Sequence, residues 1–128
     1  MQAITQQWVD KAEGDFSSME REGQVQDAPN YDLICYLAQQ CAEKYLKARL
    51  QEANSAFPKT HNLPALLELV LPVEPSWNLL QVPLTRLDDY SVEFRYPGQD
   101  AVSADAHEAR KFCRVVREVA RRSFGLPV

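Results

Sequence analysis

The sequence lacks the features that define several large classes of protein. No apolar run among its 128 residues approaches the roughly 18–20 residues of a membrane span. The N-terminal stretch has no basic segment followed by an apolar one, so we expect no signal peptide and a cytoplasmic protein. No segment shows the sustained alternation of a β-strand, and no repeat or low-complexity tract is present.

Cysteine and histidine are too few and too scattered to predict a metal site or a disulfide framework. Cys35, Cys41 and Cys113 are odd in number and have no CxxC spacing, and His61 and His107 lie far apart. We therefore expect buried free thiols in a reducing compartment. The sequence also has no Gly-rich phosphate loop, nucleophile–base pair or carboxylate dyad, so it predicts no cofactor, no metal and no catalytic residue.

What the sequence does contain is helical periodicity along most of its length. Residues 31–50 have apolar or small residues at i, i+3, i+4 and i+7, which predicts a central helix with a broad buried face. Further helices are expected over residues 3–22, 63–70, about 83–91 and 103–124, with Asn30 and Asn62 as N-caps. Pro83 should kink or divide the apolar pattern of residues 77–90. The prediction is a single all-α domain over residues 1–128, an up-and-down bundle of four or five helices.

The first expected helix has an apolar stripe with spacings of four, four, four and three residues. Its members are Ile4, Trp8, Ala12, Phe16 and Met19. Gly14 interrupts this helix, which suggests that a neighbour approaches closely there. Gly23 is expected to follow the helix as its C′ residue.

Four groups of residues together resemble one known family. They are Trp8, Ala12 and Asp15 in the first helix, the core CYLAQQCAEKYLKARL, the loop PKTHNL, and LDDYSVEFRYP before an Ala-rich helix. These motifs resemble the HEPN family of small all-α domains. The resemblance covers nearly the whole chain. It implies a helical bundle that forms a homodimer, and a substrate-binding subunit for a separately encoded minimal nucleotidyltransferase, as in a toxin–antitoxin-like pair.

The ribonuclease members of that family have an Arg separated by four to six residues from a His, and this sequence does not. The positions that would supply the Arg hold Asn54, Ser55 and Ala56 before His61, and Asp100, Ala101 and Val102 before His107. The resemblance therefore implies a non-catalytic nucleotide- or substrate-binding protein. Two alternatives stay open: an RNA-cleaving toxin with a degenerate motif, and a structural protein–protein interaction module.

The RYP loop is the first candidate ligand site. Arg95 follows an apolar helix end and precedes Tyr96 and a proline, so its planar guanidinium would suit a phosphate or a nucleobase. The structural alternative is that Arg95 pairs with a nearby carboxylate of Asp88, Asp89 or Glu93 and pins the loop.

Three further residues complete the expected ligand site. Lys44 and Lys47 lie where the apolar face of the central helix meets its polar face, where they would either neutralise a phosphate or extend over the edge of the core. His61 and Thr60 directly precede a helix N-terminus, which suggests either an anion site or simple capping and loop closure.

Four arginines of the last helix fall on one side of it, at i, i+4, i+7 and i+11. They are Arg110, Arg114, Arg117 and Arg121. Such a stripe could bind a polyanion or an acidic partner. It could also be solvated, or it could face the acidic side of the first helix within the bundle or across a dimer. No aromatic residue is interleaved on that side, which argues against single-stranded nucleic acid.

Overall fold

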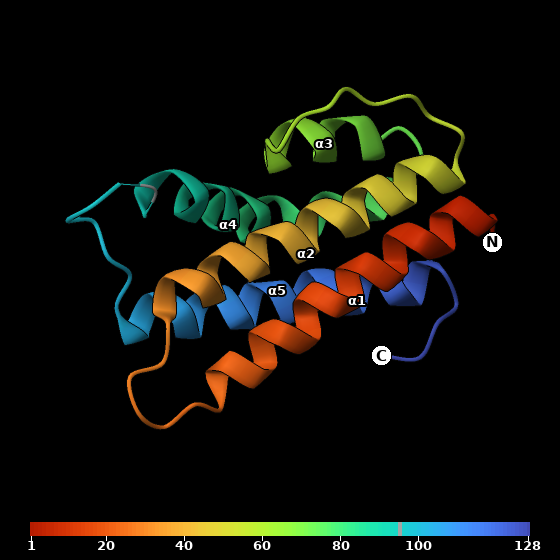
Figure 1. Ribbon diagram of the computed structural model, residues 1–128. Coiled ribbons are helices and arrows are strands. Elements are labelled where there is room, and N and C mark those ends of the chain that lie inside the picture. Colours follow the sequence, from red (N-terminus) through yellow and green to blue (C-terminus); the bar gives the residue numbers. More distant parts are fainter. Residues whose placement is uncertain (95) are drawn as a thin grey trace.

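The structure, a computed structural model, describes residues 1–94 and 96–128. Over these residues it is an all-α bundle, as predicted (Figure 1). The elements in order are α1 (Ala3–Gly23), α2 (Tyr31–Glu52), α3 (Leu63–Val70), the 3₁₀ helix η1 (Pro75–Leu80), α4 (Gln81–Glu93) and α5 (Ser103–Ser123). No helix in the described part is both long and apolar enough to cross a membrane.

Side-chain caps and left-handed residues set the ends of these helices. The Asn30 side chain accepts a hydrogen bond from Leu33 N–H (3.0 Å), and Asn62 does the same for Ala65 N–H (2.9 Å), so both predicted N-caps are confirmed. At the C-terminal ends, Asn54 follows α2 with φ 54° and Gly125 follows α5 with φ 70°.

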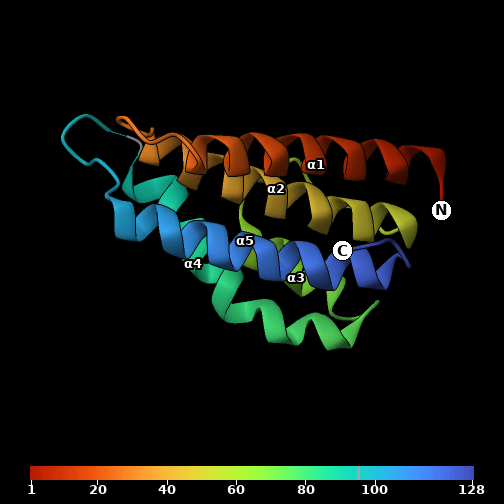
Figure 2. The same ribbon diagram turned by 90° about the horizontal axis from the view of Figure 1, so that it is seen from below.

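The central helix of the bundle is α2, which packs against α1, α3, α4 and α5. Figures 1 and 2 show α1 on one side of α2 and the pair α3 and α4 on the other. The prediction that residues 31–50 form the centre of the bundle is confirmed. Its buried residues include Ile34, Ala38, Tyr45, Leu46 and Leu50.

The three cysteines are all buried, as predicted. Burial raises the pKa of the Cys35 thiol to about 12, with nearby carboxylates adding to the effect. Burial also raises the pKa of Cys41, and Cys113 of α5 lies beside it. The Cys35 and Cys41 thiols therefore remain protonated and uncharged at neutral pH.

Pro83 divides the apolar pattern of residues 77–90, as predicted. The pattern becomes η1 followed by α4, and Pro83 is the third residue of α4, where its missing N–H removes no intrahelical bond. Both pieces bury their apolar side, including Trp77, Leu84 and Leu87.

The buried face of α1 differs in part from the sequence prediction. Ala12 and Met19 of the predicted stripe are buried, and Trp8 and Phe16 pack against the core, but Ile4 is exposed and the buried face also includes Thr5 and Val9. The reason is that each four-residue step turns about 40° beyond a full helical turn, so a strict four-residue stripe drifts off the buried face.

The close approach expected at Gly14 occurs at Gly23 instead. A Cβ on Gly14 would meet nothing within 4 Å, whereas a Cβ on Gly23 would lie 2.4 Å from the Arg110 guanidinium carbon. Gly23 is also the last residue of α1 and not its C′ residue, because the helix continues to it and Gln24 is the C-cap.

Candidate functional site

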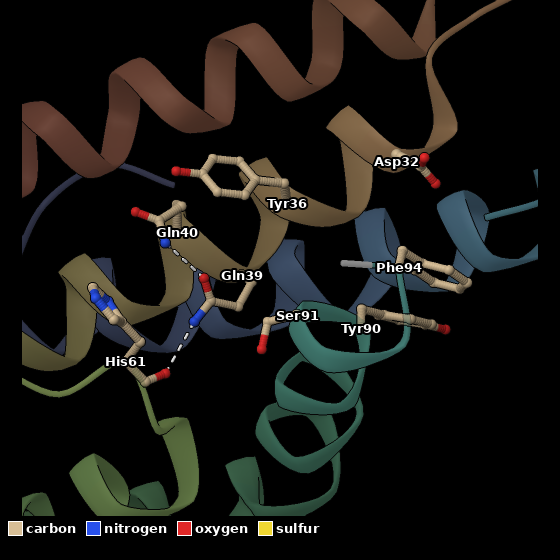
Figure 3. Close-up of a pocket in the computed structure, with 8 residues that line it drawn as sticks. All are labelled: Asp32, Tyr36, Gln39, Gln40, His61, Tyr90, Ser91 and Phe94. Carbon is tan, nitrogen blue, oxygen red and sulfur yellow. Dashed lines mark hydrogen bonds between the residues drawn. The ribbon is translucent and has the colours of Figure 1, made fainter. Parts of the chain in front are cut away.

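A cavity lies between α2, α4 and the segment that leads into α3. Its volume is about 390 Å³. Figure 3 shows its lining residues, which are Asp32, Tyr36, Gln39, Gln40, His61, Tyr90, Ser91 and Phe94.

Two glutamines of α2 supply amide groups to this pocket in a fixed arrangement. The Gln39 amide donates to the backbone carbonyl of His61 (3.0 Å), and the Gln40 amide donates to the Gln39 side-chain oxygen (2.8 Å). Figure 3 shows this chain of hydrogen bonds along one side of the pocket. Among the described residues the Gln40 side-chain oxygen has no partner, so it is free to accept a hydrogen bond from a ligand.

Aromatic rings form the other side of the pocket. Tyr90 of α4 and Phe94, the residue directly after this helix, stack on each other, with ring centroids 5.7 Å apart and an interplanar angle of 17°. The Tyr90 hydroxyl donates to Glu108, and the Arg86 guanidinium lies 5.1 Å from the centre of the Tyr90 ring. Burial and this hydrogen bond raise the Tyr90 pKa, so the hydroxyl stays neutral. The pocket lining therefore combines aromatic side chains, with Tyr90 3% exposed and Phe94 half-buried, with amide groups, and such a mixture of apolar and polar lining suits a small planar ligand.

His61 is the one predicted ligand residue that lines this pocket, among those the structure describes. Its Nδ1 lies 2.8 Å from a Glu43 carboxylate oxygen. The first N–H groups of α3 are not free for an anion, because Leu63 N–H donates to Asp88 (3.0 Å) and Ala65 N–H to Asn62. The start of α3 is therefore capped, as the structural alternative for this segment predicted, and its N–H groups do not form an anion site. In this segment the ring of His61 is the group that could contact a ligand.

Lys44 and Lys47 do not line the pocket. The Lys44 ammonium group pairs with Asp15 of α1. Lys47 is 7% exposed, pairs with Glu43 (3.0 Å) and lies over the Trp8 ring, 5.7 Å from its centre. Lys44 thus binds a carboxylate of α1, and Lys47 binds a carboxylate of its own helix while its ammonium group lies over a ring of α1.

The two loop residues predicted for the site are placed differently. Tyr96 is 63% exposed and does not line the pocket. Arg95 lies outside the described residues.

The arginine stripe of α5 faces α1 and forms ion pairs there. Glu20 binds Arg110 (3.2 Å) and Arg114 (2.8 Å). Glu13 binds Arg117 with both carboxylate oxygens at 2.8 Å, and Arg121 lies 3.5 Å from it. The structure therefore favours the intramolecular alternative for this stripe.

The sequence prediction missed Gln39, which lines the pocket, and Glu43, which bonds to His61 of the pocket lining. Gln39, Glu43 and Lys47 are polar residues at i, i+4 and i+8 of a helix whose neighbouring positions are buried, and all three are themselves buried. A polar stripe at helical spacing inside a core helix is a signal that could have identified this side of α2.

The fold and the pocket define a small helical-bundle protein with a ligand-sized cavity beside its central helix. The family model of the HEPN domain matches residues 5–123, so the chain belongs to the HEPN family. No curated protein and no solved structure matches this chain.

Proposed function

We propose that this HEPN protein binds a nucleotide or nucleoside in the pocket between α2 and α4 without chemically converting it. In this proposal it is the substrate-binding partner of a separately encoded minimal nucleotidyltransferase. The observation that carries the binding role is the pocket's pairing of a stacked aromatic wall with a fixed chain of side-chain amides.

The size and chemistry of the pocket support a nucleobase as its occupant. A volume of about 390 Å³ falls in the range of small-molecule sites, roughly 300–1,000 Å³. Base–aromatic stacking contributes about 1–3 kcal/mol per base, and a glutamine amide offers both a donor and an acceptor to the edge of a base.

The non-catalytic part of the proposal rests on the sequence, which lacks the Arg–His spacing of the ribonuclease members. The homodimer, the nucleotidyltransferase partner and the cytoplasmic location stay predictions from the sequence.

Titration calorimetry with ATP, GTP, adenosine and a short RNA tests the binding role. We expect at least one nucleotide or nucleoside to bind, and Gln40→Ala to weaken that binding about 5–10-fold, the loss of about one hydrogen bond. Gln51→Ala is the matched control, because Gln51 is also a half-buried α2 glutamine but bonds to Gln2 and does not line the pocket.

Two results would contradict the proposal. One is that none of these ligands binds, and the other is that Gln40→Ala and Gln51→Ala bind equally well. Arg95→Ala is a separate test of the loop, and unchanged affinity for every ligand would remove Arg95 from the site.

A further inference from the structure

We propose that the Glu43 carboxylate orients the His61 ring so that Nε2 of His61 accepts a hydrogen bond from a ribose hydroxyl of the bound nucleoside. The inference rests on the proposed function, since it names the part of the ligand that this side of the pocket recognises.

Glu43 is a buried carboxylate that lies behind the pocket. It is 3% exposed, and its two oxygens are used by two different residues. One lies 3.0 Å from the Lys47 ammonium group and the other 2.8 Å from Nδ1 of His61. The three side chains therefore run from the interior of the bundle to its surface at the edge of the pocket, where His61 is the exposed end, with a side chain 78% accessible.

This arrangement fixes which nitrogen of His61 is available to a ligand. A carboxylate can only accept, so Nδ1 carries the proton of the Glu43 bond. In the neutral ring Nε2 then holds the lone pair, and it has no partner among the described residues. A carboxylate behind a histidine sets the tautomer and the ring orientation in the same way at metal and catalytic sites.

Attachment of the loop before α3 to α2 does not by itself explain why the Glu43 carboxylate is buried. The loop is already bound to α2 through the backbone carbonyl of His61, which accepts from Gln39 (3.0 Å). Burying an ionised pair is costly and adds little stability compared with apolar residues of the same size. What Glu43 adds beyond the Gln39 bond is a fixed ring with a defined acceptor.

The charges around the pocket favour a hydroxyl over a phosphate as the group that His61 binds. Asp32 lines the pocket with a carboxylate, and no lysine or arginine is among its described lining residues. Lys47 is close to His61 through Glu43, but its charge is balanced by that carboxylate. An uncharged hydroxyl can donate to Nε2 without bringing a further negative charge into this site.

The tautomer is tested first, on the ligand-free protein. In ¹⁵N-labelled protein at pH 8, long-range ¹H–¹⁵N correlation spectra should show His61 as the Nδ1–H tautomer. The double variant Glu43→Leu/Lys47→Met removes both buried charges at similar volume, and its His61 should show the mixed tautomers of a free imidazole. His107, on α5 and outside this pocket, is the internal reference in both spectra. An Nε2–H tautomer in the wild type would overturn the proposal.

Hydroxyl recognition is then tested with adenosine, 2′-deoxyadenosine and 3′-deoxyadenosine. Wild type should bind adenosine about 10-fold more tightly than at least one deoxy analogue. His61→Ala should lose this discrimination, whereas His107→Ala should keep it. A His61 with only a structural role would weaken all three ligands equally when it is replaced.

The outcomes separate this inference from the proposed function. If the three nucleosides bind wild type equally, the hydroxyl contact is wrong while nucleoside binding stands. If neither nucleoside nor nucleotide binds, both are wrong.

Discussion

The hydrogen that Gly23 has in place of a Cβ allows the Arg110 guanidinium to lie against the end of α1. Arg110 in turn binds Glu20 (3.2 Å), so this contact joins α1 to α5. Gly14, in the middle of the same helix, makes no such contact and is exposed. The two glycines of α1 thus differ in what an added methyl group would do.

We expect Gly14→Ala to raise the free energy of unfolding by about 0.5–1 kcal/mol, because alanine loses less backbone entropy in an exposed helix interior and nothing obstructs its methyl group. Denaturant unfolding followed by circular dichroism measures the change. Gly23→Ala is the control and should gain less or lose stability, because Arg110 must move away from Glu20. A larger gain at Gly23 than at Gly14 would contradict this account.

Residue-scale features were predictable where their cause is local. The caps Asn30 and Asn62 depend on neighbours three residues away, and the sequence predicted both. Lys47 pairs with Glu43 four residues earlier on its own helix, which is a local pair, whereas the partner of Lys44, Asp15, depends on which side of α2 meets α1 and so on the packing of the whole bundle. The sequence therefore identified these lysines as boundary residues, but it could not say that Lys44 binds a carboxylate of α1.

At the scale of elements, a network of ion pairs joins α1 and α5. It consists of Glu13 with Arg117 and Arg121, and Glu20 with Arg110 and Arg114. Burial raises the pKa of Glu13, but hydrogen bonds from Arg117 and Tyr45 and the charges of Arg117 and Arg121 outweigh it, so the net pKa is lowered. The pKa of Glu20 is lowered in the same way, with burial opposed by Arg114 and Arg110.

A lowered carboxyl pKa makes this contact depend on pH. Its stabilisation is complete above the ordinary Glu pKa of about 4.3 and is lost as the pH falls through the lower folded-state value. We expect Glu13→Gln to reduce the free energy of unfolding by about 1–2 kcal/mol at pH 7, since it weakens a two-pronged, partly buried arginine contact. Urea unfolding at pH 7 and pH 3 should show that the difference from wild type shrinks at pH 3.

Glu118→Gln is the matched control for this prediction. Glu118 pairs with Arg122 within α5, and both side chains are exposed, so its loss should change stability by no more than about 0.5 kcal/mol. Equal effects of the two variants at pH 7 would mean that the α1–α5 ion pairs add no more than a surface pair.

The arrangement of the elements was predicted from apolar periodicity, and the pocket was not. The spacing of apolar residues along the sequence was enough to identify α2 as the central helix and to identify the buried sides of α3, α4 and α5. The pocket forms where α2, α4 and the segment before α3 meet, so its members come from three segments far apart in the sequence. Only His61 was among the predicted ligand residues, because a motif within one segment carries no information on which side chains of other segments lie opposite it.

At the scale of the whole molecule, the formal net charge of −4 and the internal pairing of the arginine stripe both oppose binding of a polyanion. We expect a labelled 20-nucleotide single-stranded RNA to bind wild type with a dissociation constant above about 100 µM at 150 mM salt, as measured by fluorescence anisotropy, since the arginines already neutralise carboxylates.

The double variant Glu13→Gln/Glu20→Gln leaves all four arginines without these partners and raises the net charge by two. It should therefore bind RNA more tightly and with a steeper salt dependence. The control Glu118→Gln/Glu68→Gln changes the charge equally but leaves the stripe paired, and should resemble wild type. Tight, salt-sensitive RNA binding by wild type would show that the stripe serves a polyanion in spite of its ion pairs, and would favour the RNA-directed alternative.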